Sequence, residues 1–166
     1  MLKLKKTRAA ANSRSRDFED SRGNALKYAF RLLGYRDRSE KEMYEKLIRK
    51  GFSEKVALEA VGYLNDKGFI DDRRFAEILR KDAVERKHLG KRGTRHYLIS
   101  KGIADDIADD VLGEDDDYLD AAKSLVEKKL RNMKDNDEEA IKRRLWGMLL
   151  RRGFSYDTIK KILHLI

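Results

Sequence analysis

Basic side chains are the residues of this sequence best suited to chemistry, and the chemistry they suit is contact with phosphate. The stretch 86–101 contains no acidic residue, and its candidate anion-binding side chains are Arg86, Lys87, Lys91, Arg92 and Arg95. Gly90 and Gly93 free the backbone at a predicted helix N-terminus, where unpaired N–H groups attract anions. The stretch predicts a clamp for phosphate or carboxylate groups. A loop that only exposes charge is the alternative.

A second basic cluster follows helical spacing near the C-terminus and comprises Lys142, Arg143, Arg144, Arg151 and Arg152. A solvated helix face is the alternative interpretation. Few aromatic residues interleave with either basic stretch, so the pattern favours contact with DNA phosphates over the reading of bases.

Acidic residues are concentrated between 105 and 120, where nine Asp and Glu occur without a basic residue. They could hold Mg²⁺ for a nuclease, repel stray nucleic acid, dock on a basic partner or form a solvated face. The register of a calcium loop is absent. The sequence has no cysteine, three scattered histidines, no phosphate loop and no serine-nucleophile motif. We therefore expect no enzyme activity, no metal and no cofactor.

An internal repeat sets the framework that positions these residues. Gly51, Gly102 and Gly153 recur with a period of 51 residues, and five columns aligned around them are apolar in all three copies. Each glycine is expected to end a helix in the left-handed conformation, with the apolar residue after it folded back on the preceding Leu pair. Trp146 aligns with Tyr44, which favours a place in the core over a base-stacking platform.

Helix signals divide each copy into three helices. In the first copy we expect helices over 24–33, 40–50 and 53–67, with Ser39 and Glu42 forming a capping box. In the second they cover 71–89, 90–101 and 105–112, and the apolar stripe of the first of these is Phe75, Ile78, Leu79 and Ala83. In the third they cover 116–132, 137–152 and 155–166. The predicted organisation is a basic tail over 1–22 and three-helix repeats over 23–68, 69–115 and 116–166.

Composition indicates an extended molecule of small modules. The chain has 166 residues, 42% of them charged, a net charge of +9 and no proline. So much charge is difficult to arrange around one large core, whereas short triplets that pack end to end need only small cores. The fold class we predict is all-α, with three tandem three-helix repeats in an elongated, curved array. No apolar run is long enough to span a membrane, and we expect a cytoplasmic monomer.

Several motifs resemble those of the RecX regulatory proteins of bacteria, in the same order and with similar spacing, from about residue 24 to 166. They are Ser39-Glu40-x-Glu42, Leu47-x3-Gly51-Phe52, Gly68-Phe69-Ile70-Asp71-Asp72-x2-Phe75-Ala76, Lys101-Gly102-Ile103 and Arg152-Gly153-Phe154. The resemblance implies a modulator, usually an inhibitor, of the RecA recombinase that lies in the groove of the RecA–DNA filament. There it would limit filament growth, ATP hydrolysis and strand exchange in DNA repair and the SOS response.

The sequence features are compatible with three functions. The first is a non-enzymatic regulator of RecA, with the filament and its DNA as partners. The second is an autonomous, sequence-nonspecific protein that binds single- and double-stranded DNA through its basic patches. The third, a magnesium nuclease that uses the acids of 105–120, would require metal-dependent cleavage.

Overall fold

Side-chain caps fix where six of the helices begin. The hydroxyl groups of Ser21, Ser39, Ser53 and Ser155 and the carboxylates of Asp71 and Asp137 each accept a hydrogen bond from a backbone N–H in the first turn that follows. Such caps satisfy groups that the helix itself leaves without a partner. The computed structural model describes residues 19–131, 133 and 137–164, and the remaining residues, including 1–18 of the predicted tail, lie outside this description.

The described residues form helices and connecting loops, with no strand. The first triplet consists of α1 (Arg22–Leu33), α2 (Glu40–Lys50) and α3 (Glu54–Asp66). The second consists of α4 (Asp72–Glu85), α5 (Lys91–Ser100) and α6 (Asp105–Val111). In the third, a short 3₁₀ helix, η1 (Asp115–Tyr118), leads into α7 (Leu119–Leu130), which is followed by α8 (Glu138–Arg151) and α9 (Tyr156–Leu163).

The repeated glycines act as predicted. Gly51, Gly102 and Gly153 have φ angles of 108°, 88° and 82°, all in the left-handed region that favours glycine. The apolar residue after each glycine is buried, and its N–H bonds to the carbonyl of the Leu five residues earlier. Each middle helix therefore ends in the same turn, which directs the chain back into the third helix of its triplet.

Three separate clusters of buried residues show that each triplet has its own core. Met43 and Leu47 lie at the centre of the first, Leu98 and Ala108 are buried in the second, and Leu149 is enclosed in the third. The helices pack mainly on other helices of their own triplet. The predicted all-α fold of three tandem three-helix units is confirmed.

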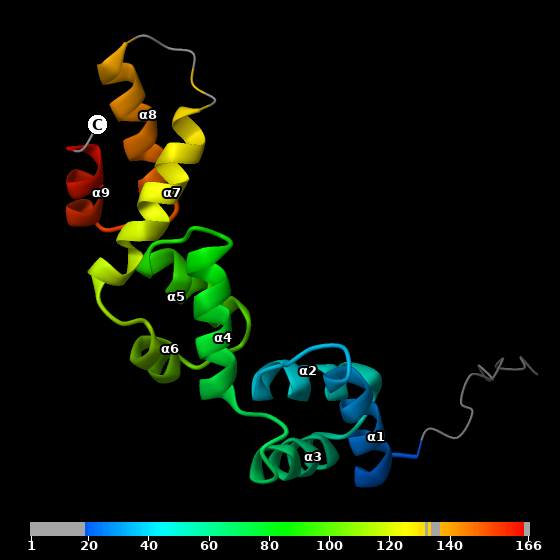
Figure 1. Cartoon of the computed structure of the whole chain (residues 1–166). Coiled ribbons are helices and arrows are strands. Elements are labelled where there is room, and N and C mark those ends of the chain that lie inside the picture. Colours follow the sequence, from blue (N-terminus) through cyan, green and yellow to red (C-terminus); the bar gives the residue numbers. More distant parts are fainter. Residues whose placement is uncertain (1–18, 132, 134–136, 165–166) are drawn as a thin grey trace, which may run out of the picture.

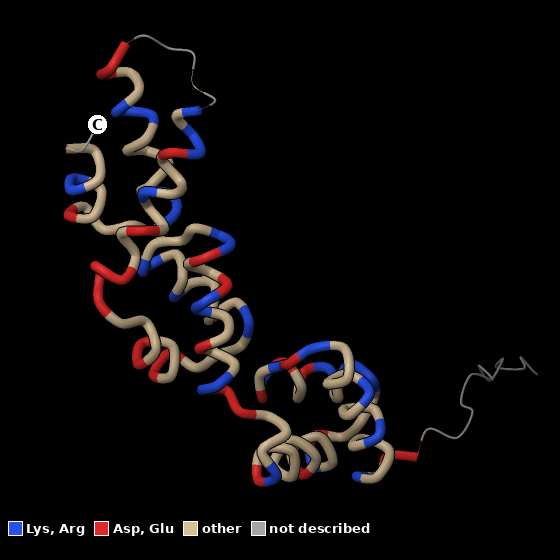
Figure 2. Tube along the Cα trace, viewed as in Figure 1, with Lys and Arg blue, Asp and Glu red and all other residues tan. Residues whose placement is uncertain are grey.

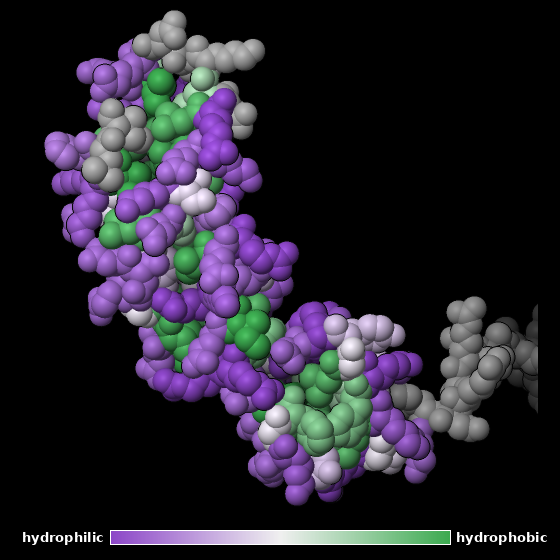
Figure 3. Space-filling view, viewed as in Figure 1, coloured by the Kyte–Doolittle hydropathy of each residue, from purple (hydrophilic) through white to green (hydrophobic). Residues whose placement is uncertain are grey.

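The triplets follow one another as an elongated, bent array (Figure 1). The second and third triplets stack in a column, and the first is displaced to one side beyond the start of α4. Apolar surface appears as separate patches within a largely hydrophilic surface (Figure 3). In the described part of the chain, no helix combines the length and the apolarity needed to cross a membrane.

Some local predictions were wrong. The helix that begins after Asp71 was expected to reach Leu89 but ends at Glu85, because the chain turns at His88, whose φ is 49°. Ile78 was assigned to the buried stripe of this helix, yet it is 49% exposed and Ala76 is buried instead. The helix expected from residue 116 begins as a 3₁₀ turn, and its predicted end at 132 lies outside the described residues.

Candidate nucleic-acid interface

Close backbone contact joins the second and third triplets. The N–H groups of Gly90 and Arg92, at the start of α5, donate to the carbonyl oxygens of Arg152 (3.0 Å) and Gly153 (3.1 Å). A Cβ atom on Gly93 would overlap the Arg152 carbonyl oxygen, and one on Gly153 would overlap the Gly93 backbone. The glycines therefore serve an interface between repeats. The expectation of unpaired N–H groups that bind an anion here was wrong for these two amides.

Basic side chains gather at this junction because the ends of α4 and α8 meet there. Beyond Glu85, the N–H groups of Arg86 and Lys87 both bond to the Asp82 carbonyl (3.1 Å each), which keeps their side chains near the C-terminus of α4. Arg152 caps the end of α8, and its guanidinium donates to the Lys87 carbonyl at 2.6 Å. Cations are favourable at both places because helix C-termini carry partial negative charge.

These side chains line a groove of about 620 Å³, which we call the junction groove. The loop after α4 forms one side, and residues of α7 and α8 form the other. Basic segments of α7 and of this loop occupy neighbouring stretches of the array (Figure 2). The lining residues are Arg86, Lys87, His88, Leu89, Leu125, Lys128, Lys129, Met148 and Arg152.

Among the described residues that line the junction groove, five are Lys or Arg and none is acidic, so this lining is strongly positive. Asp82 lies nearby and pairs with Arg86 at 3.2 Å and Lys87 at 3.6 Å. Lys87 also lies over the ring of Tyr97, 5.1 Å from its centroid. Arg86 and Lys87 share this one carboxylate, so the two cations carry more charge than it neutralises, which suits an anionic backbone more than a neutral ligand.

The rest of the first basic cluster lies apart from this groove, on α5. Arg95 pairs with Asp105 and Asp109 of α6, at 2.6 Å to each. Hydrogen bonds to Asp109 and Asp105 raise the pKa of Arg95, and the same contact lowers the pKa of Asp109. Lys91 and Arg92 occupy the first turn of α5, and the Arg92 side chain is exposed. Arg95 thus fastens α6 to α5, whereas Arg92 remains accessible.

The second basic cluster is also divided. Only Arg152 joins Arg86 and Lys87 in the junction groove. Lys142 and Arg143 line a different groove, between α8 and α9, and Arg144 and Arg151 are exposed on other parts of α8. The two clusters that the sequence indicated are therefore divided among the junction groove, α5, the groove between α8 and α9, and other parts of α8.

The acidic stretch 105–120 lies against cations of neighbouring helices. Besides the two carboxylates that hold Arg95, Asp110 pairs with Arg73 (3.2 Å), Asp117 with Arg80 (2.9 Å) and Asp116 with Lys161 (2.8 Å). Among the described residues, no three potential metal ligands gather at one place. These acids connect elements within and between the second and third triplets.

Sequence reasoning missed Lys128 and Lys129, which lie in the last turn of α7. Adjacent lysines in a last turn are usual for a helix, since they complement its dipole, and so they gave no distinct signal. Only the packing of α7 beside the loop after α4 places them opposite Arg86 and Lys87.

Comparisons with known proteins agree with this architecture. Family models described as the first, second and third three-helix domains of RecX match residues 25–64, 71–112 and 115–163. The regulatory protein RecX of Chlorobium limicola is 36% identical over 143 residues, which cover 86% of this chain and 89% of that protein. The counterpart in Chlorobaculum tepidum is 33% identical, over 89% of this chain and 91% of that protein.

A solved structure has the same arrangement of helices. The crystal structure of RecX from Lactobacillus salivarius superposes with a TM-score of 0.79 at 28% identity, and the match covers 89% of this chain and 99% of that one. Three domain matches in the order of the three triplets, together with relatives aligned over most of their length, establish that the chain belongs to the RecX family of regulatory proteins.

Proposed function

We propose that this protein regulates the RecA recombinase by lying along the groove of the RecA–DNA filament and limiting filament growth, ATP hydrolysis and strand exchange. Family membership supports a regulatory role, and the resemblance of its motifs to RecX supplies the partner. The structural observation that carries the proposal is the junction groove, a basic surface formed only where the second triplet docks on the third. An elongated array with such a surface suits a long, curved, anionic object.

The proposed mechanism requires no chemistry by the protein. The triplets, each with its own core, would contact successive filament subunits and oppose their exchange or rearrangement. The junction groove would contact DNA phosphates through the Lys and Arg side chains among its described lining residues. Phosphate contacts position a protein on nucleic acid without reading its sequence.

Autonomous, sequence-nonspecific DNA binding is the second candidate function. The absence of an acidic residue from the described lining of the junction groove favours it, and so does the exposed Arg92 on α5. Arg95, in contrast, is held by two carboxylates and contributes little free charge. This function predicts DNA affinity that falls steeply with salt and needs no recombinase.

Retention on bead-bound single-stranded DNA, with and without preformed RecA filaments, separates the two functions. The regulator should be retained on filaments at salt concentrations where naked DNA no longer retains it. The double variant Arg86→Gln/Lys129→Gln should be retained less, and the slope of log affinity against log salt should fall by roughly 1.4 for two lost contacts to single-stranded DNA.

Lys27→Gln/Lys55→Gln is the matched control, because it removes the same charge from exposed positions on α1 and α3. It should behave like the wild type. Equal retention on naked DNA and on filaments would favour autonomous DNA binding. Equal losses in the two double variants would show that the junction groove is not the site.

A further inference from the structure

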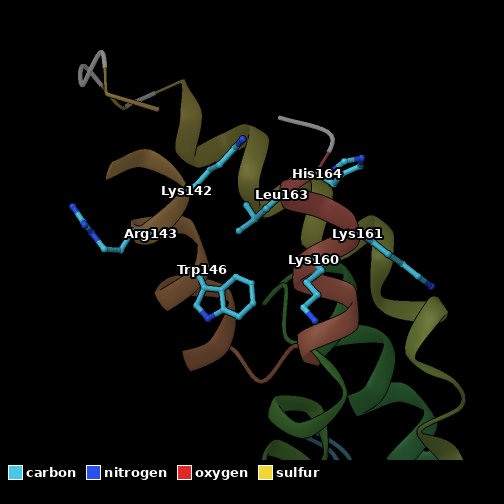
Figure 4. Close-up of a pocket in the computed structure, with 7 residues that line it drawn as sticks. All are labelled: Lys142, Arg143, Trp146, Lys160, Lys161, Leu163 and His164. Atoms are coloured by element: carbon cyan, nitrogen blue, oxygen red, sulfur yellow. The ribbon is translucent and has the colours of Figure 1, made fainter. Parts of the chain in front are cut away.

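A second groove, in the third triplet, has a composition unlike that of the junction groove. It lies between α8 and α9 and has a volume of about 680 Å³ (Figure 4). Trp146 and Leu163 form its apolar part, and four of the seven described residues that line it are Lys or Arg. We call it the tryptophan groove.

The sequence favoured a place in the core for Trp146. In the structure Trp146 lines the groove between α8 and α9 and packs only partly against the third core. Its indole extends from α8 toward α9 (Figure 4). One part of the residue packs against the third core, and its ring centroid lies 5.9 Å from that of Tyr156, tilted by 46°. Tyr156 is 58% exposed. The half-buried Trp146 ring, which lines the groove and contacts Tyr156, offers flat apolar surface that the fold leaves incompletely covered.

Cations of both helices line the groove. Lys142 and Arg143 belong to α8, and Lys160 and Lys161 belong to α9. Lys142 and Lys161 have acidic partners, Glu138 at 2.6 Å and Asp116 at 2.8 Å. Within the described part of the chain, Arg143 and Lys160 make no ion pair. An anionic occupant would supply the charge that these two cations lack.

We propose that the tryptophan groove binds single-stranded nucleic acid, with one base stacked on Trp146 and the adjoining phosphates held by cations of α8 and α9. Aromatic stacking tolerates every base, and basic side chains along a groove follow the backbone. An acidic peptide fits less well, because helical peptides bind through several apolar anchors, and among the described lining residues this groove offers Trp146 and Leu163 alone as apolar ones. Double-stranded DNA keeps its bases stacked on one another and cannot use the indole.

This site does not depend on the recombinase, so it can be tested with the protein and nucleic acid alone. Trp146 is the only tryptophan of the chain, and tryptophan fluorescence therefore reports on this groove directly. Titration with a short oligothymidylate should quench and shift the emission, because a stacked base lies against the indole. A backbone of abasic sites with the same number of phosphates should leave the emission nearly unchanged, and so should polyglutamate.

Binding of a labelled oligothymidylate provides a second readout. We expect Trp146→Leu, which keeps an apolar side chain on the core, to weaken binding about tenfold, as for the loss of one stacked base. Lys160→Gln should weaken it severalfold, whereas Lys123→Gln, an exposed lysine on α7, should leave it unchanged. Saturable binding of oligothymidylate without a change in emission would overturn the proposal. Equal quenching by the abasic backbone or by polyglutamate would overturn it as well.

Discussion

At the scale of single residues, the neighbouring acids Asp71 and Asp72 hold two different helices. Asp71 accepts from the Arg74 N–H (2.9 Å) and caps α4, its own helix. Asp72 points back to the first triplet and accepts from the Glu40 N–H (2.9 Å) at the start of α2. Burial is the main cause that raises the pKa of Asp72 from 3.8 to about 6, and the charges of Glu40 and Asp71 add to it.

The charge of Asp72 should therefore lower stability near neutral pH. Between about pH 4 and 6 the folded protein holds a proton that the unfolded chain releases, so its stability falls as the pH rises through this window. Asp72→Asn keeps an oxygen for the Glu40 N–H and removes the charge. We expect it to raise the free energy of unfolding at pH 7 by on the order of 1 kcal/mol, reduced for solvent screening of a half-buried group, and by much less at pH 4.

Denaturant unfolding at the two pH values measures this difference. Asp71→Asn, a neighbouring change that also keeps a cap acceptor, is the control for the loss of a carboxylate. A destabilised Asp72→Asn protein at pH 7 would mean that the ionised carboxylate strengthens the contact between the triplets.

Capping shows how far local sequence predicts single contacts. Ser39 is the N-cap of α2 as expected, because its partner, the Glu42 N–H, lies three residues away (3.1 Å). The other half of the expected capping box was wrong, since the Glu42 carboxylate pairs with Arg36 and Arg38 from the preceding loop. Burial alone would raise the pKa of Glu42, but these two guanidinium groups outweigh it and lower the pKa. Ser39 also donates to the Lys101 carbonyl (2.8 Å), a contact between repeats that local spacing cannot reveal.

At the scale of elements, the same contact recurs between successive triplets. The glycine turn that follows the middle helix of one triplet lies against the start of the middle helix of the preceding triplet. Gly102 lies against Ser39 at the start of α2, and Gly153 lies against Gly90 and Gly93 at the start of α5. The period of 51 residues therefore describes both the triplet and its connection to the next one.

Adding one methyl group should test the second of these connections. In Gly93→Ala the new Cβ would overlap the Arg152 carbonyl oxygen, which belongs to the backbone and cannot easily move. We expect a loss of about 1–3 kcal/mol of stability. Faster hydrogen exchange should appear at the Gly90 and Arg92 amides, whose hydrogen bonds cross this junction.

Gly62→Ala is the matched control. Gly62 lies within α3, where an added Cβ meets nothing within 4 Å. This change should stabilise the protein by roughly 0.5–1 kcal/mol, because alanine loses less conformational freedom than glycine in a helix. An unchanged melting temperature and unchanged exchange in Gly93→Ala would contradict the close approach at the junction.

The candidate site could be predicted only in part because it depends on these connections. Composition and spacing identified Arg86, Lys87 and Arg152 as basic, since charge and helical period are local properties of the sequence. Their meeting in one groove results from the docking of the third triplet on the second, which brings residues 65 positions apart into hydrogen-bond contact. Lys128 and Lys129 enter the groove for the same reason.

At the scale of the whole molecule, three small cores in a row give a long surface from a short chain. A compact arrangement of the same residues would hide the junctions between triplets. In the bent array (Figure 1), the junction groove lies at one of them. Acidic residues of 105–120 connect neighbouring elements and reduce the number of carboxylates available to oppose this groove. The architecture thus concentrates positive charge at the junction of the second and third triplets.

ATP hydrolysis by preformed RecA filaments on single-stranded DNA, titrated with this protein, tests the central claim most directly. Binding along the filament groove predicts that hydrolysis is lost with fewer than one copy per RecA, since one bridging molecule would restrain several subunits. Competition for DNA alone would need far more protein. Hydrolysis that stays unchanged until the filament is saturated with this protein would contradict the account.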